Sequence, residues 1–362
     1  MKFLRNLGAE SRRDCLYLVR SSFDVENLNE DFRLIKALQT LNFILRRNGR
    51  VIILAHRGRP KGKDLKLSLR PLIPFLEKNL RKKVTFFSDF DFKQIARVIQ
   101  HSSESVFLLE NLRFLSEEEE NNDLLAKELA GLGEVYINDD FAASHRKHTS
   151  LYALPKLLPR YAGLQLEDEI IHLSKILNSA EHPLLVIVGG AKVPEKMDFL
   201  WLISKTADTL IAGGVVANTL LYARGDDIGA SLYESDALPL ANKLIQLDKL
   251  VLPVDFVMED DKIKDIGDKS SEIFVAKISH ARTIIWNGVM GLFEDKRFAY
   301  GSEAVLRAIA ASSAFSVVGG GETTCLVRNM KLEDKISFLS TGGGAMLEFL
   351  GGKKLPGLEA LN

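Results

Sequence analysis

Four short apolar runs in the second half of the chain end in glycines that lead directly into helical segments. Glycine has no side chain, so backbone N–H groups can approach phosphate oxygens there, and the N-terminus of a following helix favours their negative charge. One such turn is more often only a tight connection, but four at the carboxyl edge of one sheet predict a nucleotide site. The runs are VIVGGAKV (186–193), LIAGGVVA (210–217), SVVGGGET (316–323) and LSTGGGAM (339–346).

The first half of the chain instead places cationic side chains just after its apolar runs, with one more, Arg33, in the first turns of a predicted helix. Guanidinium groups bind carboxylates and phosphates bidentately, so several of them together predict a pocket for a small polyanion. Each one alone is as well explained by a solvated surface charge. We therefore expect one half to bind a nucleotide, the other a phosphorylated acid, and phosphoryl transfer to occur between them. The cations are Arg33, His56, Arg57, Arg59, Arg113, His145, Arg146, Lys147 and His148.

Several enzyme classes are excluded by missing motifs. The chain has no GxGxxG dinucleotide fingerprint and no GxxxxGK[ST] phosphate loop. The motif set of protein kinases is missing as well. A different arrangement of glycine turns must hold any nucleotide.

Composition narrows the partners and the compartment. Lys plus Arg and Asp plus Glu both number 48 in 362 residues, so the whole chain carries no field that would favour nucleic acid or a membrane surface. Cys15 and Cys325 are far apart and lack a CxxC partner, which argues against a disulfide framework or a zinc site. Without a signal-like or membrane-spanning apolar run, a cytoplasmic protein is expected.

The elements that must position these residues alternate between short aliphatic runs and segments of helical period. This alternation is typical of βα units, and it predicts an α/β protein with two doubly wound, Rossmann-like parallel sheets. The expected strands are Cys15–Arg20, Val51–Ala55, Val84–Phe87, Val106–Glu110 and Val135–Asn138 in the first half, and Leu184–Val188, Thr209–Ala212, Leu250–Pro253, Thr283–Trp286, Phe315–Val318 and Ile336–Ser340 in the second.

Two segments are predicted as long helices. In Glu30–Arg47, apolar residues three or four apart (Phe32, Ile35, Leu38, Leu41 and Leu45) define the face expected to pack on the sheet. Glu167–Asn178, after the Leu/Pro-rich stretch 151–160, is the candidate connection between the two halves. The acidic run Glu117–Glu120 is interpreted as the first turn of a helix rather than as a site.

Nine ordered segments resemble phosphoglycerate kinases over nearly the whole chain. They are HRGRPKG (56–62), LLENLRF (108–114), INDDFAASHRKH (137–148), GGAKVPEK (189–196), AGGVVANT (212–219), LPVD (252–255), IWNGVMGLFE (285–294), VVGGGET (317–323) and STGGGAMLEFL (340–350). The resemblance implies reversible phosphoryl transfer between 1,3-bisphosphoglycerate and ADP, giving 3-phosphoglycerate and ATP, by a phosphotransferase of glycolysis and gluconeogenesis that is usually monomeric.

The resemblance also implies a domain plan. An acid-binding domain would span 1–160, a hinge helix 161–178 and a nucleotide-binding domain 179–346. A tail, 347–362, would pack back on the first domain.

Site residues follow from the same resemblance. Transfer itself would be assisted by Arg33, Lys192 and the turns at Gly320 and Gly343. The acid would be bound by Ser22, Asp24, Arg33, His56, Arg59, Arg113 and Arg146. The nucleotide would be bound by Gly190, Lys192, Lys196, Gly213, Gly214, Asn287, Gly288, Glu294, Gly319, Gly320, Gly321, Glu322 and Thr323, with Glu322 serving Mg²⁺.

The chain departs from the family's pattern at the end of its first strand. Ser22 stands where the family has an aspartate, Asp24 where it has an asparagine, and Glu26 where it has a proline. Glu322 also replaces an aspartate, and Val289 a proline. Residues two apart on a strand face the same way, so the carboxylate has either moved by one same-face position or been lost from an altered site.

These departures leave three functions open. The first is an active phosphoglycerate kinase, whose reaction needs positioning and positive charge but no general base, because the attacking oxygens are ionised at neutral pH. The second is a catalytically weakened relative that binds nucleotides or anions in a regulatory or structural role. The third is a phosphotransferase for a different small acid.

Overall fold

The computed structural model describes residues 1–7, 14–25 and 32–362, so the substitution at Glu26 lies outside the described residues. The chain divides into two compact units. One comprises Met1–Ile170 together with Lys354–Asn362, and the other Ile171–Lys353. Among the described residues, no helix is both long and apolar enough to span a lipid bilayer.

The first unit is built on a sheet of six parallel strands in the order β3-β4-β2-β1-β5-β6. Its central strands are aliphatic and buried on both sides, as a sheet covered on two faces requires. Strands β1 to β5 match the predicted runs to within one residue at each end, and β6 was not predicted. The strands are β1 (Leu16–Ser21), β2 (Arg50–Leu54), β3 (Val84–Phe87), β4 (Val106–Leu109), β5 (Val135–Asp139) and β6 (Arg160–Ala162).

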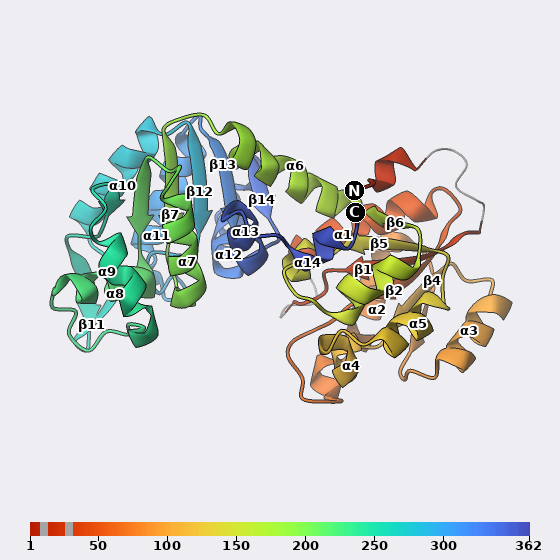
Figure 1. The fold of residues 1–362 in the computed structure, drawn as a ribbon. Helices are drawn as coiled ribbons and strands as arrows, with labels where there is room; N and C mark the ends of the chain where they lie inside the picture. Colours follow the sequence, from red (N-terminus) through yellow and green to blue (C-terminus); the bar gives the residue numbers. More distant parts are fainter. Residues whose placement is uncertain (8–13, 26–31) are drawn as a thin grey trace. The chain divides into compact units, whose positions relative to one another are not determined.

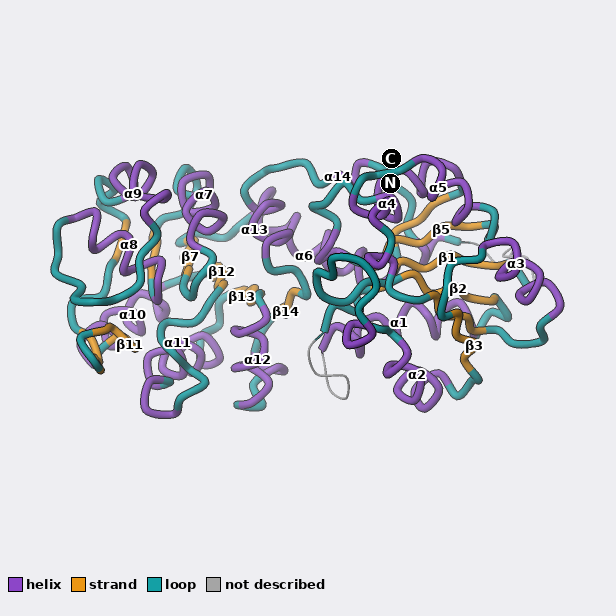
Figure 2. Tube along the Cα trace, turned by 90° about the horizontal axis from the view of Figure 1, so that it is seen from below, coloured by secondary structure: helices purple, strands orange, loops and turns teal. Residues whose placement is uncertain are grey.

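Helices cover both faces of this sheet. Right-handed crossovers place α1 and α2 on one face and α3 and α5 on the other, because the chain reverses its direction across the sheet after β3 (Figures 1 and 2). The helices are α1 (Phe32–Leu45), α2 (Ile73–Leu80), α3 (Phe92–His101), α4 (Ser116–Glu119), α5 (Asp123–Ala130) and α14 (Pro356–Glu359). Short helical turns are η1 (Leu4–Asn6), η2 (Leu65–Leu67), η3 (Arg70–Leu72), η4 (Leu112–Phe114), η5 (Phe141–Ala143), η6 (Thr149–Ala153) and η7 (Leu154–Leu157).

The buried face of α1 differs from the predicted one. Leu34, Ala37, Leu41 and Ile44 face the core, whereas Ile35 is 46% exposed. The spacing of three and four residues allowed two adjacent faces, and packing against the sheet chose the one centred on Leu34 and Leu41.

The second unit contains a sheet of six parallel strands in the order β14-β13-β12-β7-β8-β9. Counted from β7, this is the 3-2-1-4-5-6 order of dinucleotide-binding folds. The strands are β7 (Leu184–Val188), β8 (Thr209–Ala212), β9 (Leu250–Val251), β12 (Thr283–Asn287), β13 (Phe315–Gly319) and β14 (Phe338–Ser340). A separate antiparallel pair, β10 (Phe256–Glu259) and β11 (Lys262–Ile266), was not predicted.

This sheet also lies between two helical layers. Figure 2 shows α7, α8, α9 and α13 on one face and α10, α11 and α12 on the other. The helices are α6 (Leu164–Ser179), which begins in the first unit, α7 (Val193–Ile203), α8 (Gly214–Arg224), α9 (Leu238–Leu244), α10 (Asp268–His280), α11 (Tyr300–Ala311), α12 (Gly321–Asn329) and α13 (Gly344–Leu350). Short turns are η8 (Ser235–Ala237), η9 (Lys296–Phe298) and η10 (Glu333–Lys335). The prediction of two doubly wound α/β sheets is confirmed.

Candidate active site

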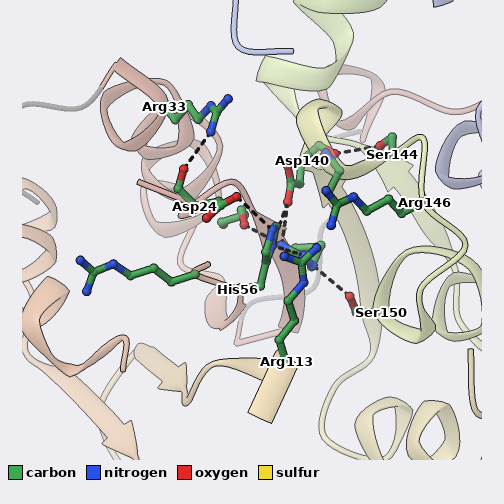
Figure 3. A network of polar contacts seen from close by, with 12 residues as sticks. Asp24, Arg33, His56, Arg113, Asp140, Ser144, Arg146 and Ser150 are labelled. Atoms are coloured by element: carbon green, nitrogen blue, oxygen red, sulfur yellow. Dashed lines mark hydrogen bonds and ion pairs between the residues drawn. The ribbon is translucent and has the colours of Figure 1, made fainter. Parts of the chain in front are cut away.

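In the first unit, the polar cluster lies where the crossovers diverge from the sheet. Strands β1 and β5 are neighbours, yet the chain leaves them toward opposite faces, and such a switch point opens a crevice at the carboxyl ends of the strands. The segment after β1 carries Ser22 and Asp24, and the segment after β5 carries Asp140. Residues from four further segments converge on this point (Figure 3).

Arg20, the last but one residue of β1, is the centre of the cluster and is fully buried. Its Nη1 donates to Asp140 Oδ2 at 2.7 Å, its Nε donates to Ser150 Oγ at 2.9 Å, and its Nη2 lies 2.7 Å from His56 Nδ1. Both partners of the Arg20–Asp140 ion pair are inaccessible to water. An ion pair this deeply buried is retained only when its geometry is well satisfied.

Asp24 lies on the other side of the His56 ring. Its Oδ2 is 3.6 Å from His56 Nε2, its Oδ1 accepts from the Gly58 N–H at 2.8 Å, and its backbone oxygen accepts from Arg33 Nη1 at 2.8 Å. Burial alone would raise the pKa of Asp24, but the His56 side chain, the Gly58 N–H and the Arg33 charge together lower it. A carboxylate therefore stands at position 24 in its ionised form.

Ser22 is in a different situation. It is fully buried, and its hydroxyl has no hydrogen-bond partner in the part of the chain that the structure describes. Asp24 is instead about half exposed, with 42% of its side-chain surface accessible. The carboxylate at position 24 thus faces the open side of the cluster, where a ligand can reach it.

Arg113 and Arg146 crowd the same region with positive charge. Arg113 is buried, and its Nη1 donates to the Gly58 carbonyl at 2.6 Å while its Nε lies 3.3 Å from Glu119 Oε1. Burial and the charges of Arg146 and Arg20 lower the pKa of Arg113 to about 10. Burial and the charge of Arg59 likewise lower the pKa of Arg146. A bound polyanion would relieve this mutual repulsion.

His148 belongs to the same electrostatic group. It is buried, and desolvation together with the charges of Arg113, Arg20 and Arg146 lowers its pKa to about 3. It is therefore neutral at physiological pH and can serve only as a neutral partner. Arg59, by contrast, is exposed at the rim.

In the second unit, the glycine turns meet at the switch point between β7 and β12. The Gly190 N–H donates to the Val289 carbonyl at 2.7 Å, and the Gly214 N–H donates to the Met290 carbonyl at 2.9 Å. Gly190 and Gly214 both have positive φ, and a Cβ added to Gly214 would lie 2.6 Å from the Gly190 nitrogen. Only glycine allows the turns after β7 and β8 to approach this closely. Gly213, which directly precedes Gly214, is the N-cap of α8.

The turns after β12 and β13 are joined by a second set of contacts. The Gly288 N–H donates to Thr323 Oγ1 at 2.8 Å. Asn287 is buried, and its Nδ2 has no hydrogen-bond partner among the residues described. A Cβ on Gly320 would lie 3.2 Å from that Nδ2, so this amide faces the Gly319–Gly321 turn. The amide and the start of α12 together offer N–H donors to an anion.

Lysines and carboxylates border these turns. Lys196 is buried and donates through Nζ to the Gly189 carbonyl; burial lowers its pKa to about 8, although the charge of Glu322 opposes this shift. Lys192 is exposed at the N-cap of α7. A Cβ on Gly190 would meet Glu322 Oε2 at 3.0 Å and Lys196 Nζ at 3.1 Å, so both side chains reach the same turn.

Of the remaining predicted residues, Gly343 lies beside another glycine turn, whereas Glu294 lies on an exposed segment. Gly343 is the N-cap of α13, and a Cβ there would lie 3.9 Å from Gly320 Cα, so these two turns are neighbours. Glu294 is exposed in the segment after β12. The structure thus gathers the predicted acid-binding residues in the first unit and the predicted glycine turns in the second.

Sequence reasoning missed four buried residues of the acid cluster. Arg20, Glu118, Asp140 and Ser150 connect its members, but none was assigned to the site. A charged residue inside an otherwise apolar strand run was the one available signal for Arg20. Glu118 was hidden in an acidic run that does form the first turn of a helix, α4.

Comparison with known proteins agrees with this geometry. The family model for phosphoglycerate kinase matches residues 17–353. A phosphoglycerate kinase of Rubrobacter xylanophilus is 40% identical over 370 residues, covering 95% of this chain and 94% of its own length. One from Moorella thermoacetica is 40% identical over 388 residues, covering 99% of this chain and 98% of its own.

Solved structures give the same result. Phosphoglycerate kinase from Coxiella burnetii superposes with a TM-score of 0.81 at 33% identity, covering 99% of this chain and 98% of the other. The enzyme from Pyrococcus horikoshii superposes with a TM-score of 0.88 at 28% identity, covering 100% and 98%. With its fold, its ordered motifs and its full-length relatives in agreement, the chain belongs to the phosphoglycerate kinase family, a family of phosphotransferases.

Proposed function

We propose that this protein catalyses reversible phosphoryl transfer between 1,3-bisphosphoglycerate and ADP, giving 3-phosphoglycerate and ATP. The observation that carries the proposal is the crowding of Arg113, Arg146 and Arg20 around His56 at the switch point of the first unit. Burial and mutual repulsion of these cations cost free energy in the unliganded protein. A small acid with a phosphate and a carboxylate offsets that cost.

In the acid site, the cationic groups would bind the charged ends of the substrate. Arg113 and Arg146 would share its phosphate with the exposed Arg59, since guanidinium groups bind such oxygens bidentately. His56 would donate to the acid, and Asp24 would accept from its hydroxyl group. Asp24 thereby takes over the role that the family's pattern gives to an aspartate at position 22.

On the nucleotide side, the turns at Gly190, Gly213, Gly214, Gly288 and Gly319–Gly321 would hold phosphate groups through backbone N–H groups. Asn287, Lys192, Lys196 and Thr323 would add side-chain contacts. Exposed Glu294 would bind the ribose hydroxyls.

The residues present also fit a magnesium ion. Glu322 supplies one carboxylate beside the Gly190 turn. The described residues contain no cluster of three or more His, Cys, Asp or Glu side chains, so the protein would supply few of the ion's ligands. Magnesium commonly takes one or two carboxylates, with waters and substrate phosphates completing its octahedron. When bound, the ion would neutralise charge on the transferred phosphoryl group.

The reaction then depends on positioning and on positive charge. Arg33 and Lys192 would stabilise charge on the transferred group, and the backbone N–H groups of the turns at Gly320 and Gly343 would bind its oxygens. No side chain has to remove a proton, because the attacking oxygens are already ionised. His148 would be a poor base in any case, because its pKa of about 3 makes the ring a very weak proton acceptor.

A coupled assay for ATP formation from 1,3-bisphosphoglycerate and ADP, with and without Mg²⁺, tests the proposal. Turnover that requires both substrates and the ion is expected. Glu322→Asp should retain activity, whereas Glu322→Ala should shift the Mg²⁺ dependence to higher concentration. Binding of both ligands without turnover would instead identify a weakened relative, and turnover only with another acid would identify a different phosphotransferase.

We further propose that the enzyme acts as a cytoplasmic monomer without nucleic-acid or membrane partners. The balanced charge, 48 cationic against 48 anionic residues, supports the last two points. Sedimentation at several protein concentrations tests the monomeric state, and a mass twice that of the chain would contradict it.

A further inference from the structure

We propose that Glu118 and Ser150 act through Arg20 as positioning residues, which hold His56 as the tautomer that carries its proton on Nε2. The inference rests on the proposed function for what His56 donates to, but the tautomer itself follows from the contacts alone. None of these three residues was among the predicted site residues. They form a buried chain of hydrogen bonds behind the acid site.

This chain of hydrogen bonds begins at Glu118, which is fully buried. Its Oε1 accepts from Ser150 Oγ at 2.6 Å, and its Oε2 accepts from the Ser150 backbone N–H at 2.9 Å. A serine hydroxyl has one proton to donate. Because that proton is directed at Glu118, the oxygen lone pairs of Ser150 remain available to accept a donor on the other side.

That donor is Arg20. Its Nε donates to Ser150 Oγ at 2.9 Å, and its Nη1 donates to Asp140 Oδ2 at 2.7 Å. These two bonds fix the plane of the guanidinium at both edges. The remaining nitrogen, Nη2, is thereby aimed at His56 Nδ1, 2.7 Å away.

This last contact determines the state of the imidazole. A guanidinium can only donate hydrogen bonds, so His56 Nδ1 must be the unprotonated acceptor. The proton of the neutral ring is then on Nε2, which is 3.6 Å from Asp24 Oδ2 on the open side of the cluster. His56 consequently presents an N–H donor toward the acid site.

The surrounding charges keep the ring in this neutral state. His56 is faced by Arg20 from β1, Asp24 from the segment after it, Arg113 from η4, Asp140 after β5 and His148 before η6. Burial lowers the pKa of His56 to about 4, and the charges of Arg20 and Arg113 act in the same direction, while Asp24 and Asp140 oppose them. A second ring proton would also collide with the Arg20 donor.

Glu118 is otherwise hard to account for. Glu119 and Glu120, its neighbours in the acidic run, are exposed, and a carboxylate buried without a role is costly. Burial raises the pKa of Glu118, an effect opposed by the Arg20 charge and the two Ser150 donors. The carboxylate is thus satisfied by the residue that positions Arg20.

Long-range ¹H–¹⁵N NMR of the histidine rings tests the tautomer in the unmodified protein. The chain has seven histidines, and the signals of His56 are assigned by their loss in His56→Gln. We expect an unprotonated Nδ1, a protonated Nε2 and no titration from about pH 5 to about pH 8. A protonated Nδ1, or a midpoint inside that range, would overturn the proposal. Neither result depends on whether the protein turns over phosphoglycerate.

Ser150→Ala and Glu118→Gln test the positioning chain. Each removes part of the support of Arg20, so a measurable fraction of Nδ1–H tautomer should appear. The KM for 3-phosphoglycerate should rise about tenfold, as for loss of one hydrogen bond to a charged group. Glu120→Gln, in the same acidic run but exposed, should change neither reading. A rise in KM with the tautomer unchanged in both variants would reduce Glu118 and Ser150 to structural residues.

Discussion

Among single residues, Ser22 and Asp24 are the pair at which we predict a departure from the pattern of the family. Asp24 anchors the Gly58 N–H and faces His56, while the Ser22 hydroxyl is enclosed. A carboxylate restored at position 22 would be buried beside an already ionised Asp24. Two carboxylates in one site disfavour each other's charge, so the residues at 22 and 24 should be energetically coupled.

A double-mutant cycle measures this coupling. Ser22→Asp alone should reduce kcat/KM, because it adds a second carboxylate to the acid site. Ser22→Asp combined with Asp24→Asn, which restores the family's arrangement, should recover or improve it. Strictly additive effects would show that the carboxylate has not been exchanged between the two positions.

Arg33 is the side chain that we propose for the transfer step. Its Nη1 bond to the Asp24 carbonyl holds it beside the acid site. Arg33→Ala should lower kcat by about 10²- to 10³-fold, the typical loss for one preorganised donor, with a much smaller change in KM. Arg47→Ala, which removes an exposed arginine just after α1, is the matched control. An Arg33→Ala enzyme with more than half of the original kcat would exclude Arg33 from the mechanism.

At the scale of elements, the glycine turns constrain each other, apart from the phosphate contacts that we propose for them. Gly214 begins α8 with positive φ, and its Cα lies against the backbone of the turn after β7. Gly321 begins α12, but a Cβ there would meet no atom within 4 Å. Packing therefore requires glycine at position 214. At position 321 packing would allow a side chain, so only the proposed ligand contact would favour glycine there.

Gly214→Ala should destabilise the unliganded protein by more than 1 kcal/mol, on the order of a strained backbone position plus a steric clash. Gly321→Ala should leave the thermal midpoint of the unliganded protein unchanged or slightly higher, since alanine favours a helix. Thermal unfolding monitored by circular dichroism compares the two. Equal midpoints would mean that the turns after β7 and β8 can separate without cost.

A buried carboxyl group, that of Asp139, holds the start of helix α6. Asp139, at the end of β5, is fully buried, and its Oδ1 accepts from the Gln165 N–H at 3.0 Å. Burial raises the pKa of Asp139 to about 8, although hydrogen bonds from the Thr40 side chain and from the Gln165 and Leu166 backbone oppose the rise. Between about pH 4 and pH 8 the folded protein thus holds a proton that the unfolded chain has released.

It follows that this residue makes the free energy of unfolding fall as pH rises from about 4 to about 8, by up to about 1.4 kcal/mol per pH unit. Asp139→Asn cannot titrate, so its unfolding free energy should decline less over that range. Urea denaturation at several pH values gives both slopes, with exposed Asp123→Asn as the control. Identical slopes in the original protein and Asp139→Asn would contradict the buried, protonated carboxyl.

At the scale of the molecule, the proposed functional groups are divided between two units. The acid cluster belongs entirely to Met1–Ile170, and the glycine turns belong entirely to Ile171–Lys353. Within the first unit, the C-terminal segment is tied to the acid-site loops, because the Gly357 N–H donates to the Ser144 carbonyl at 2.8 Å. Each unit therefore holds only part of the machinery proposed for transfer.

We predict that the molecule becomes more compact only when both substrates are bound. Bringing the two ligands together would exclude water from an acyl phosphate that solvent hydrolyses. Small-angle scattering should give a smaller radius of gyration with 3-phosphoglycerate and a nucleotide together than with either one. The proposed movable element is the connection Leu151–Asn178, which includes most of α6, helped by the tail Leu347–Asn362. An unchanged radius in the ternary state would refute closure.

Local patterns were sufficient to predict much of this protein. Buried parallel strands are continuous aliphatic runs, so β7 and β8 were predicted to the residue and other central strands nearly so. The glycine turns and the cations after the strands could also be found, because strand ends of a parallel sheet share one edge. Short or exposed strands such as β6 and the β10–β11 pair have no comparable signal.

What the tertiary structure decided is which groups are buried together. Arg20 and Asp140, 120 residues apart, form an ion pair only because β1 and β5 are neighbours. Packing against the Ser150 segment encloses Glu118 while Glu119 stays exposed, and packing of α1 on the sheet buries Leu34 rather than Ile35. Sequence spacing determines which residues share a face. The partner that covers that face, and therefore the burial, charge state and hydrogen bonds of each group, exists only once distant segments have packed together.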